Sequence, residues 1–64
     1  MESHYIITVT VRGATRYLHV DHNMRLRIVE NRSQATGFGH RLIPIYKELT
    51  SMRFNVGSVD HEEV

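Results

Sequence analysis

The chain has 64 residues, no cysteine, 41% hydrophobic residues and a formal net charge of +1. These values exclude a disordered chain, disulfide bonds and a thiolate zinc site, and they indicate one domain near the lower size limit for a self-sufficient core. No run is long enough to span a bilayer, and the start of the chain lacks the basic-then-apolar order of a signal peptide. We therefore expect a cytoplasmic protein with no membrane partner.

Residues 5–11, YIITVTV, alternate between two faces with a period of two, and this pattern predicts a β-strand. A two-residue turn at Gly13-Ala14, with glycine first, is typical of a type II′ hairpin leading into a second strand. This turn pairs Val9 with Leu18 and places the aliphatic side chains of both strands on one face.

A second turn is predicted at Asp21-His22-Asn23, because asparagine tolerates the left-handed conformation at the end of such a loop. The resulting register opposes Leu18 to Leu26. On the reverse face, it opposes His19 to Arg25 and Tyr17 to Arg27. Residues 5–29 then form a three-stranded meander.

A short extended piece is expected at residues 35–38, followed by a helix whose apolar residues recur with helical spacing. Pro44 fits only the first turn, so the helix should begin within residues 41–44 and end near Met52. The stretch RFNVGSV, residues 53–59, predicts a last strand before an acidic tail at 60–64.

The predicted fold class is α+β, with a three-stranded antiparallel meander, one helix packed on its aliphatic face and a short C-terminal fourth strand. The chain forms a single domain, 1–64, with an ordered core at about 4–59. The expected core comprises Ile7, Val9, Leu18, Val20, Met24, Leu26, Ile28, Leu42, Ile45, Leu49, Phe54 and Val56.

The candidate binding surface is the outer face of the meander, opposite the helix. Between residues 3 and 59 the chain carries eight basic and three acidic residues, a balance of +5. Such a surface suits an acidic protein or the phosphates and base edges of DNA, while its alternative is an ordinary solvated sheet face. The candidate residues are Thr8, Thr10, Arg12, Tyr17, His19, Arg25 and Arg27.

A second candidate is an anion site at Gly39, His40 and Arg41, where free amides of the first helical turn would face a bound anion. The alternative is a plain helix entrance in which the glycines let the chain bend and Phe38 tucks under the helix. The acidic tail, with Asp60, Glu62 and Glu63, is either solvated or competes for the basic face.

The five histidines are dispersed, with no cysteine or paired carboxylate beside them, so we expect no metal and no cofactor. No serine has a nucleophile-elbow context, and a domain this small has little volume for a walled catalytic pocket. The sequence therefore favours a protein that is not an enzyme.

The segment SQATGF, with Ser33, Ala35, Thr36 and Phe38, followed by a helix and a last strand, resembles a pattern in small orphan proteins encoded by bacteriophages. The resemblance implies a non-enzymatic accessory protein or inhibitor that binds and modulates a host protein in the host cytoplasm.

Two functional hypotheses follow. The first is a protein-binding modulator that uses the basic outer face or an exposed strand edge, and such an edge also allows a homodimer. The alternative is a nucleic-acid-binding domain, by architectural analogy with the arm-binding domains of some phage integrases. A structural subunit of a larger assembly is a third option.

Overall fold

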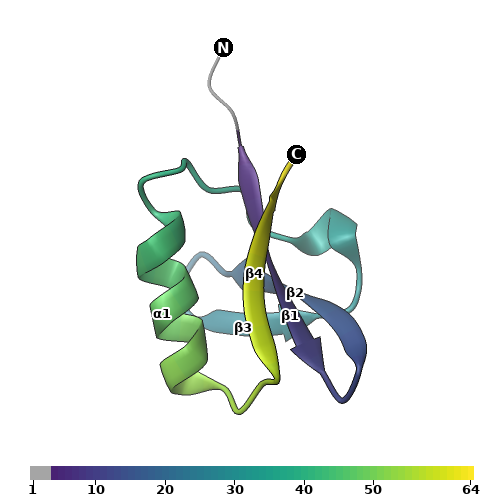
Figure 1. The fold of residues 1–64 in the computed structure, drawn as a ribbon. Helices are drawn as coiled ribbons and strands as arrows, with labels where there is room; N and C mark the ends of the chain where they lie inside the picture. The colour runs from purple at the N-terminus through teal and green to yellow at the C-terminus, as the bar shows by residue number, and fades with distance from the viewer. Residues whose placement is uncertain (1–3) are drawn as a thin grey trace.

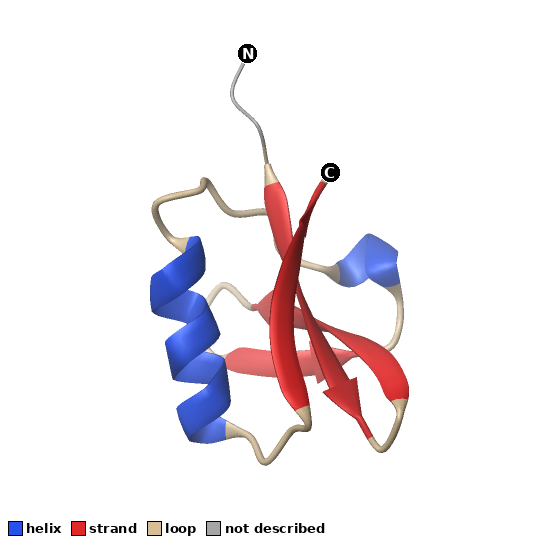
Figure 2. Ribbon diagram, in the orientation of Figure 1, coloured by secondary structure: helices blue, strands red, loops and turns tan. Residues whose placement is uncertain are grey.

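The computed structural model describes residues 4–64, which form an α+β domain with a four-stranded antiparallel sheet and one α-helix. The strand order β3-β2-β1-β4 contains the expected meander, and the fourth strand adds to the outer edge of the first (Figure 1). The helix lies alongside β4 and packs against β1 and β4 (Figure 2). In chain order the elements are β1 (Tyr5–Val11), β2 (Ala14–Val20), β3 (Leu26–Val29), the 3-10 turn η1 (Arg32–Gln34), α1 (Ile43–Arg53) and β4 (Ser58–Glu63).

The β1–β2 hairpin closes at Arg12-Gly13, which corrects the predicted turn at Gly13-Ala14. Both turn residues have positive φ, 51° and 79°, as a type I′ turn requires. Val9 consequently pairs with Arg16, two residues away from its predicted partner Leu18. Because side chains alternate with a period of two, this difference leaves every side chain on its expected face.

The β2–β3 connection is also longer than predicted, since it spans residues 21–25 and has its left-handed residue at Met24 (φ 63°) instead of Asn23. The Asp21 Oδ1 atom accepts the amides of Asn23 (2.9 Å) and Arg25 (3.0 Å). These local hydrogen bonds favour the longer loop over the tight one. The register moves by two residues here as well, so the faces are again preserved.

Residues 35–38, which precede α1, form hydrogen bonds with both β1 and β2 where these two strands diverge. The Thr36 amide donates to the Leu18 carbonyl (3.0 Å), and the Thr36 hydroxyl accepts the Val20 amide (2.7 Å). Phe38 exchanges two backbone hydrogen bonds with Tyr5, at 2.8 and 2.9 Å. This is the expected extended piece, and it satisfies backbone groups that the divergence would otherwise leave unpaired.

The last strand corrects two predictions. It occupies residues 58–63 rather than 53–59, so most of the expected acidic tail is a strand that pairs with β1. Its start is set at Gly57, whose amide donates to the Thr10 carbonyl (2.8 Å). A Cβ at residue 57 would lie 3.2 Å from that carbonyl oxygen, so the close approach favours glycine. The acidic side chains fit here because an edge strand leaves them in solvent.

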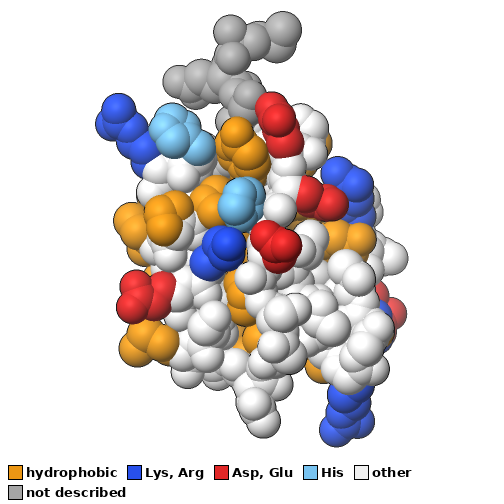
Figure 3. All heavy atoms as spheres, in the orientation of Figure 1, with side chains coloured by type: hydrophobic (Ala, Val, Ile, Leu, Met, Phe, Trp, Pro, Cys, Tyr) orange, Lys and Arg blue, Asp and Glu red, His pale blue; other side chains and the backbone are white. Residues whose placement is uncertain are grey.

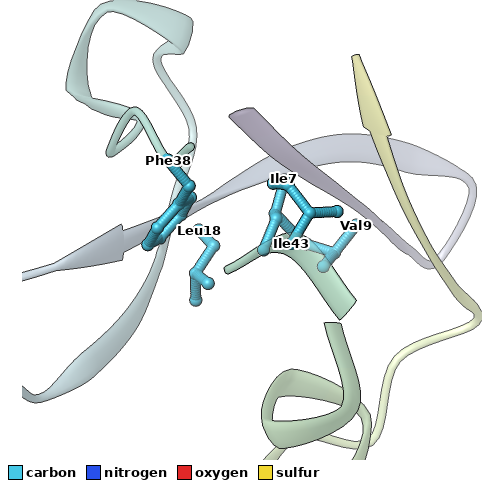
Figure 4. Packing of buried hydrophobic residues seen from close by; sticks show 5 residues of the cluster. All are labelled: Ile7, Val9, Leu18, Phe38 and Ile43. Carbon is cyan, nitrogen blue, oxygen red and sulfur yellow. The ribbon is translucent and has the colours of Figure 1, made fainter. Parts of the chain in front are cut away.

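The core lies between the sheet and α1, where the side chains of β1 and β2 meet Phe38 and Ile43 (Figure 4). The Phe38 ring stacks on Tyr46 of α1, with ring centroids 4.6 Å apart, which confirms that Phe38 tucks under the helix. The buried hydrophobic residues are Ile6, Ile7, Val9, Leu18, Phe38 and Ile43.

The predicted core is confirmed on the sheet and wrong on the helix. Ile7, Val9 and Leu18 are buried, and Val20, Leu26, Ile28, Phe54 and Val56 are half-buried against them. Met24, Leu42, Ile45 and Leu49 are exposed. Ile6, Ile43 and Thr50 are buried without having been predicted.

The helix ends were predicted well, but its orientation was not. Apolar side chains occupy much of its circumference, so two different stripes could face the sheet. The stripe that does so contains Ile43, Tyr46 and the fully buried Thr50, whose hydroxyl donates to the Tyr46 carbonyl (2.7 Å). That local hydrogen bond lets a polar side chain occupy the tight contact with the sheet.

Candidate functional site

The predicted outer-face residues divide into two groups. Thr8 and Tyr17 are direct cross-strand partners, and so are His19 and Arg27. Thr10 continues the same face of β1, beside the Ser58 hydroxyl that donates to its side chain at 3.1 Å. These residues lie on the face opposite the core, as predicted, because the register errors were both even.

Arg12 and Arg25 occupy turns instead of strands. Arg12 is at the tip of the β1–β2 hairpin, and Arg25 closes the β2–β3 loop through its amide. The amide of Arg25, joined by that of Asn23, holds the pKa of the Asp21 carboxyl below its usual range, because both hydrogen bonds favour the charged form. The nearby charges of His22 and Arg27 act in the same direction. Five of the seven candidates therefore lie on strands and two in turns.

The outer face is also less open than predicted, because η1 crosses it. Ile6, on the same face as Thr8, is only 4% exposed. Arg32 of η1 reaches Glu62 of β4, with 3.3 Å between Nη1 and Oε1. The chain thus covers part of the face that sequence reasoning assigned to a partner.

A small notch remains between η1 and the β2–β3 pair. It has a volume of about 320 Å³ and is lined by His19, Arg27, Ile28, Val29 and Gln34. The His19 Nδ1 atom lies 2.7 Å from the Gln34 carbonyl oxygen. A carbonyl only accepts, so Nδ1 carries the hydrogen, and this bond orients the imidazole ring.

Two amides next to the candidate anion site at Gly39, His40 and Arg41 already donate to backbone carbonyls. The Leu42 amide donates to the Gly39 carbonyl (3.0 Å), and the Ile43 amide donates to the His40 carbonyl (3.4 Å). Pro44 follows and has no N–H. The geometry therefore favours the helix-entrance interpretation of this segment.

On the face seen in Figure 3, acidic side chains lie close to basic side chains and histidine. Lys47 of α1 lies 3.9 Å from the Asp60 carboxylate and 3.2 Å from His61 Nδ1, and the His61 ring meets Tyr5 edge-on. β4 and the arginine-bearing β3 are opposite edges of the sheet. By register, however, Asp60 is opposite Thr8 and Glu62 is opposite Ile6, so both belong to the candidate face, and Glu62 contacts Arg32 there. Competition of the acidic residues for the basic face therefore stays a prediction. No cluster of three or more potential metal ligands exists within residues 4–64.

An exposed apolar stripe extends along α1 and its N-cap residue, and three of its four residues, Leu42, Ile45 and Leu49, had been predicted in the core. We call it the helix stripe, and it consists of Leu42, Ile45, Leu49 and Met52, which are 45%, 53%, 42% and 77% exposed. These residues recur at helical spacing on the side of α1 turned away from Ile43 and Thr50. The sequence does contain a signal for this stripe. The helix carries more apolar residues than a single buried face can accommodate.

The residues behind the SQATGF resemblance have structural roles. Thr36 satisfies backbone groups of β2, and Phe38 enters the core. These roles explain why a threonine and an aromatic residue stand at this spacing before the helix.

None of the helices in the described part of the chain has the length and apolarity that crossing a bilayer requires. No protein-family model, no curated protein and no solved structure matches the sequence or the fold.

Proposed function

We propose that this protein is a small non-enzymatic binding module whose helix stripe docks on another protein, in the manner of an accessory protein or inhibitor. The observation that carries the proposal is the exposure of four large apolar side chains in line along α1 and its N-cap residue, in a domain of 64 residues. Contiguous apolar patches on small soluble proteins mark interaction sites, because their exposure to water is unfavourable.

The charges around the stripe indicate the chemistry of the partner. Arg41 precedes α1 and Arg53 ends it, and neither has an ion-pair partner within 4.0 Å among residues 4–64. The matching surface is an amphipathic helix with an apolar stripe of similar length, about 16 Å for the 11 residues of α1, and carboxylates near both ends.

A second copy of this chain is a poorer match for the stripe. In an antiparallel pairing of two α1 helices, Arg41 would lie near Arg53 of the other copy, and a parallel pairing would oppose each arginine to itself. Like charges placed together disfavour association.

The test uses two synthetic amphipathic peptides with the same leucine stripe, one with glutamates at both ends and one with lysines. We expect the glutamate peptide to bind about tenfold more tightly in fluorescence anisotropy. The double variant Ile45→Ser/Leu49→Ser should lose this binding, whereas Val64→Ser should retain it, because Val64 is an exposed apolar residue (70%) outside α1.

The variant Arg41→Gln/Arg53→Gln should bind both peptides alike, since it removes the proposed charge recognition. Equal binding of the two peptides to the wild type, or retained binding by the Ile45/Leu49 variant, would overturn the proposal. A dimer that Leu49→Ser dissociates in analytical ultracentrifugation would show that the stripe serves self-association instead.

Nucleic-acid binding through the outer face is the second candidate. The observation in its favour is that His19 and Arg27 are direct cross-strand neighbours beside an open notch. The division of the remaining candidates between turns and strands makes this candidate weaker than docking through the helix stripe.

A further inference from the structure

The notch between η1 and the β2–β3 pair has a composition suited to a small ligand. It is lined by the polar residues His19, Arg27 and Gln34 and by the aliphatic Val29, while Ile28 between Arg27 and Val29 turns its side chain to the core. Its volume of about 320 Å³ lies at the lower end of the range for ligand pockets. The notch is separate from the helix stripe, because His19 and Arg27 belong to the face of the sheet opposite α1.

His19 is held in one tautomer at the wall of this notch. Its Nδ1–H donates to the Gln34 carbonyl at 2.7 Å, so Nε2 is the nitrogen left to meet a ligand. The bond joins β2 to η1 and orients the ring before any ligand arrives. This preorganisation reduces the cost of ordering a binding group.

Arg27 provides a positively charged guanidinium group that can still form hydrogen bonds with a ligand. It is exposed, and it has no ion-pair partner within 4.0 Å among the described residues. The carboxylate whose charge interacts with it is Asp21, but that group already accepts the amides of Asn23 and Arg25. The guanidinium therefore remains able to bind an anionic group with its planar set of donors.

We propose that this notch binds a phosphomonoester. The phosphate lies between the Arg27 guanidinium and His19 Nε2, and the esterified carbon group packs against Val29, which is on the same face of the sheet as Arg27. A phosphomonoester suits this pair better than a carboxylate does. It has enough oxygens for both groups, and near neutral pH part of it keeps a P–OH that can donate to a neutral imidazole.

A free nucleotide and the 5′ end of a nucleic-acid strand present the same chemistry. The probes that separate them are adenosine, adenosine 5′-monophosphate, and one short single-stranded oligonucleotide with and without a 5′-phosphate. In amide NMR titrations of the full chain, we expect the two phosphate-bearing probes to shift the signals of Arg27, Val29 and Gln34. Adenosine and the unphosphorylated strand should bind about tenfold more weakly or not at all.

The matched variants are Arg27→Gln and Arg53→Gln, which remove the same charge from β3 and from the end of α1. Arg27→Gln should weaken binding of adenosine 5′-monophosphate about tenfold, whereas Arg53→Gln should leave it unchanged. His19→Phe should also weaken it, since the ring shape is kept and Nε2 is lost.

Equal weakening by the Arg27 and Arg53 variants would show non-specific attraction of anions and would overturn the site. Equal affinity for adenosine and its monophosphate would also overturn it. Tighter binding of the phosphorylated strand than of the nucleotide would identify strand ends as the better ligand and would support the shared phosphate chemistry.

Discussion

The two faces of α1 differ in the opposite sense from that expected of an amphipathic helix. The inward face contains Ile43, Tyr46 and Thr50, one of which buries a hydroxyl. The outward face, the helix stripe, is entirely aliphatic or thioether, and 42–77% of each side chain is exposed. The difference teaches that burial in this domain follows how closely a side chain can approach the sheet, and not how apolar that side chain is.

The largest predicted effect tests which face of α1 is buried, with two substitutions placed two residues apart. Ile43→Ala should lower the free energy of unfolding by about 2–5 kcal/mol, because it empties a buried position. Ile45→Ala should change it by less than about 0.5 kcal/mol, because that side chain is 53% exposed. Urea unfolding of both variants measures the difference, and equal losses would mean that the two faces are wrongly assigned.

A smaller effect on stability is expected from a substitution on the inward face of α1. Thr50→Val removes the hydroxyl but keeps the branched shape, and in a regular helix the Tyr46 carbonyl still accepts a backbone amide. We therefore expect a change of less than about 1 kcal/mol in thermal or urea unfolding. A loss of several kcal/mol would show that the hydroxyl specifies how α1 packs.

The smallest predicted effect concerns a charge that acts through local hydrogen bonds, without packing. The folded state lowers the pKa of Asp21 below its ordinary 3.8, chiefly through the Arg25 amide, so the carboxylate binds fewer protons when folded. Its stabilisation is therefore complete above the unfolded value and is lost as the pH falls through the folded value.

Asp21→Asn tests this sign, because it keeps an acceptor oxygen and removes the charge. The variant should be slightly less stable than the wild type at about pH 6 and equally stable at about pH 2. A deficit of the same size at both pH values would assign the effect to hydrogen-bond geometry and contradict the role of charge.

Much of the sheet could be predicted, and the candidate sites only in part. Alternation identified β1 and the correct face for each strand residue, even though both hairpin registers were two residues off. The pairing of His19 with Arg27 was therefore missed, although both had been named as candidates on one face. Register depends on the conformation of the turns. Arg12 and Met24 have positive φ, which arginine and methionine rarely adopt, so the sequence did not indicate these turns.

The sequence by itself determined the α+β class, the meander, the limits of α1 and the burial of Phe38, because these depend on periodicity and on the local effects of proline and glycine. Only the tertiary structure decided which face of α1 meets the sheet, that Asp60 and Glu62 lie in a strand, and that His19 meets Gln34. Those outcomes depend on contacts between segments far apart in the chain, where space and unpaired backbone groups outweigh local preference.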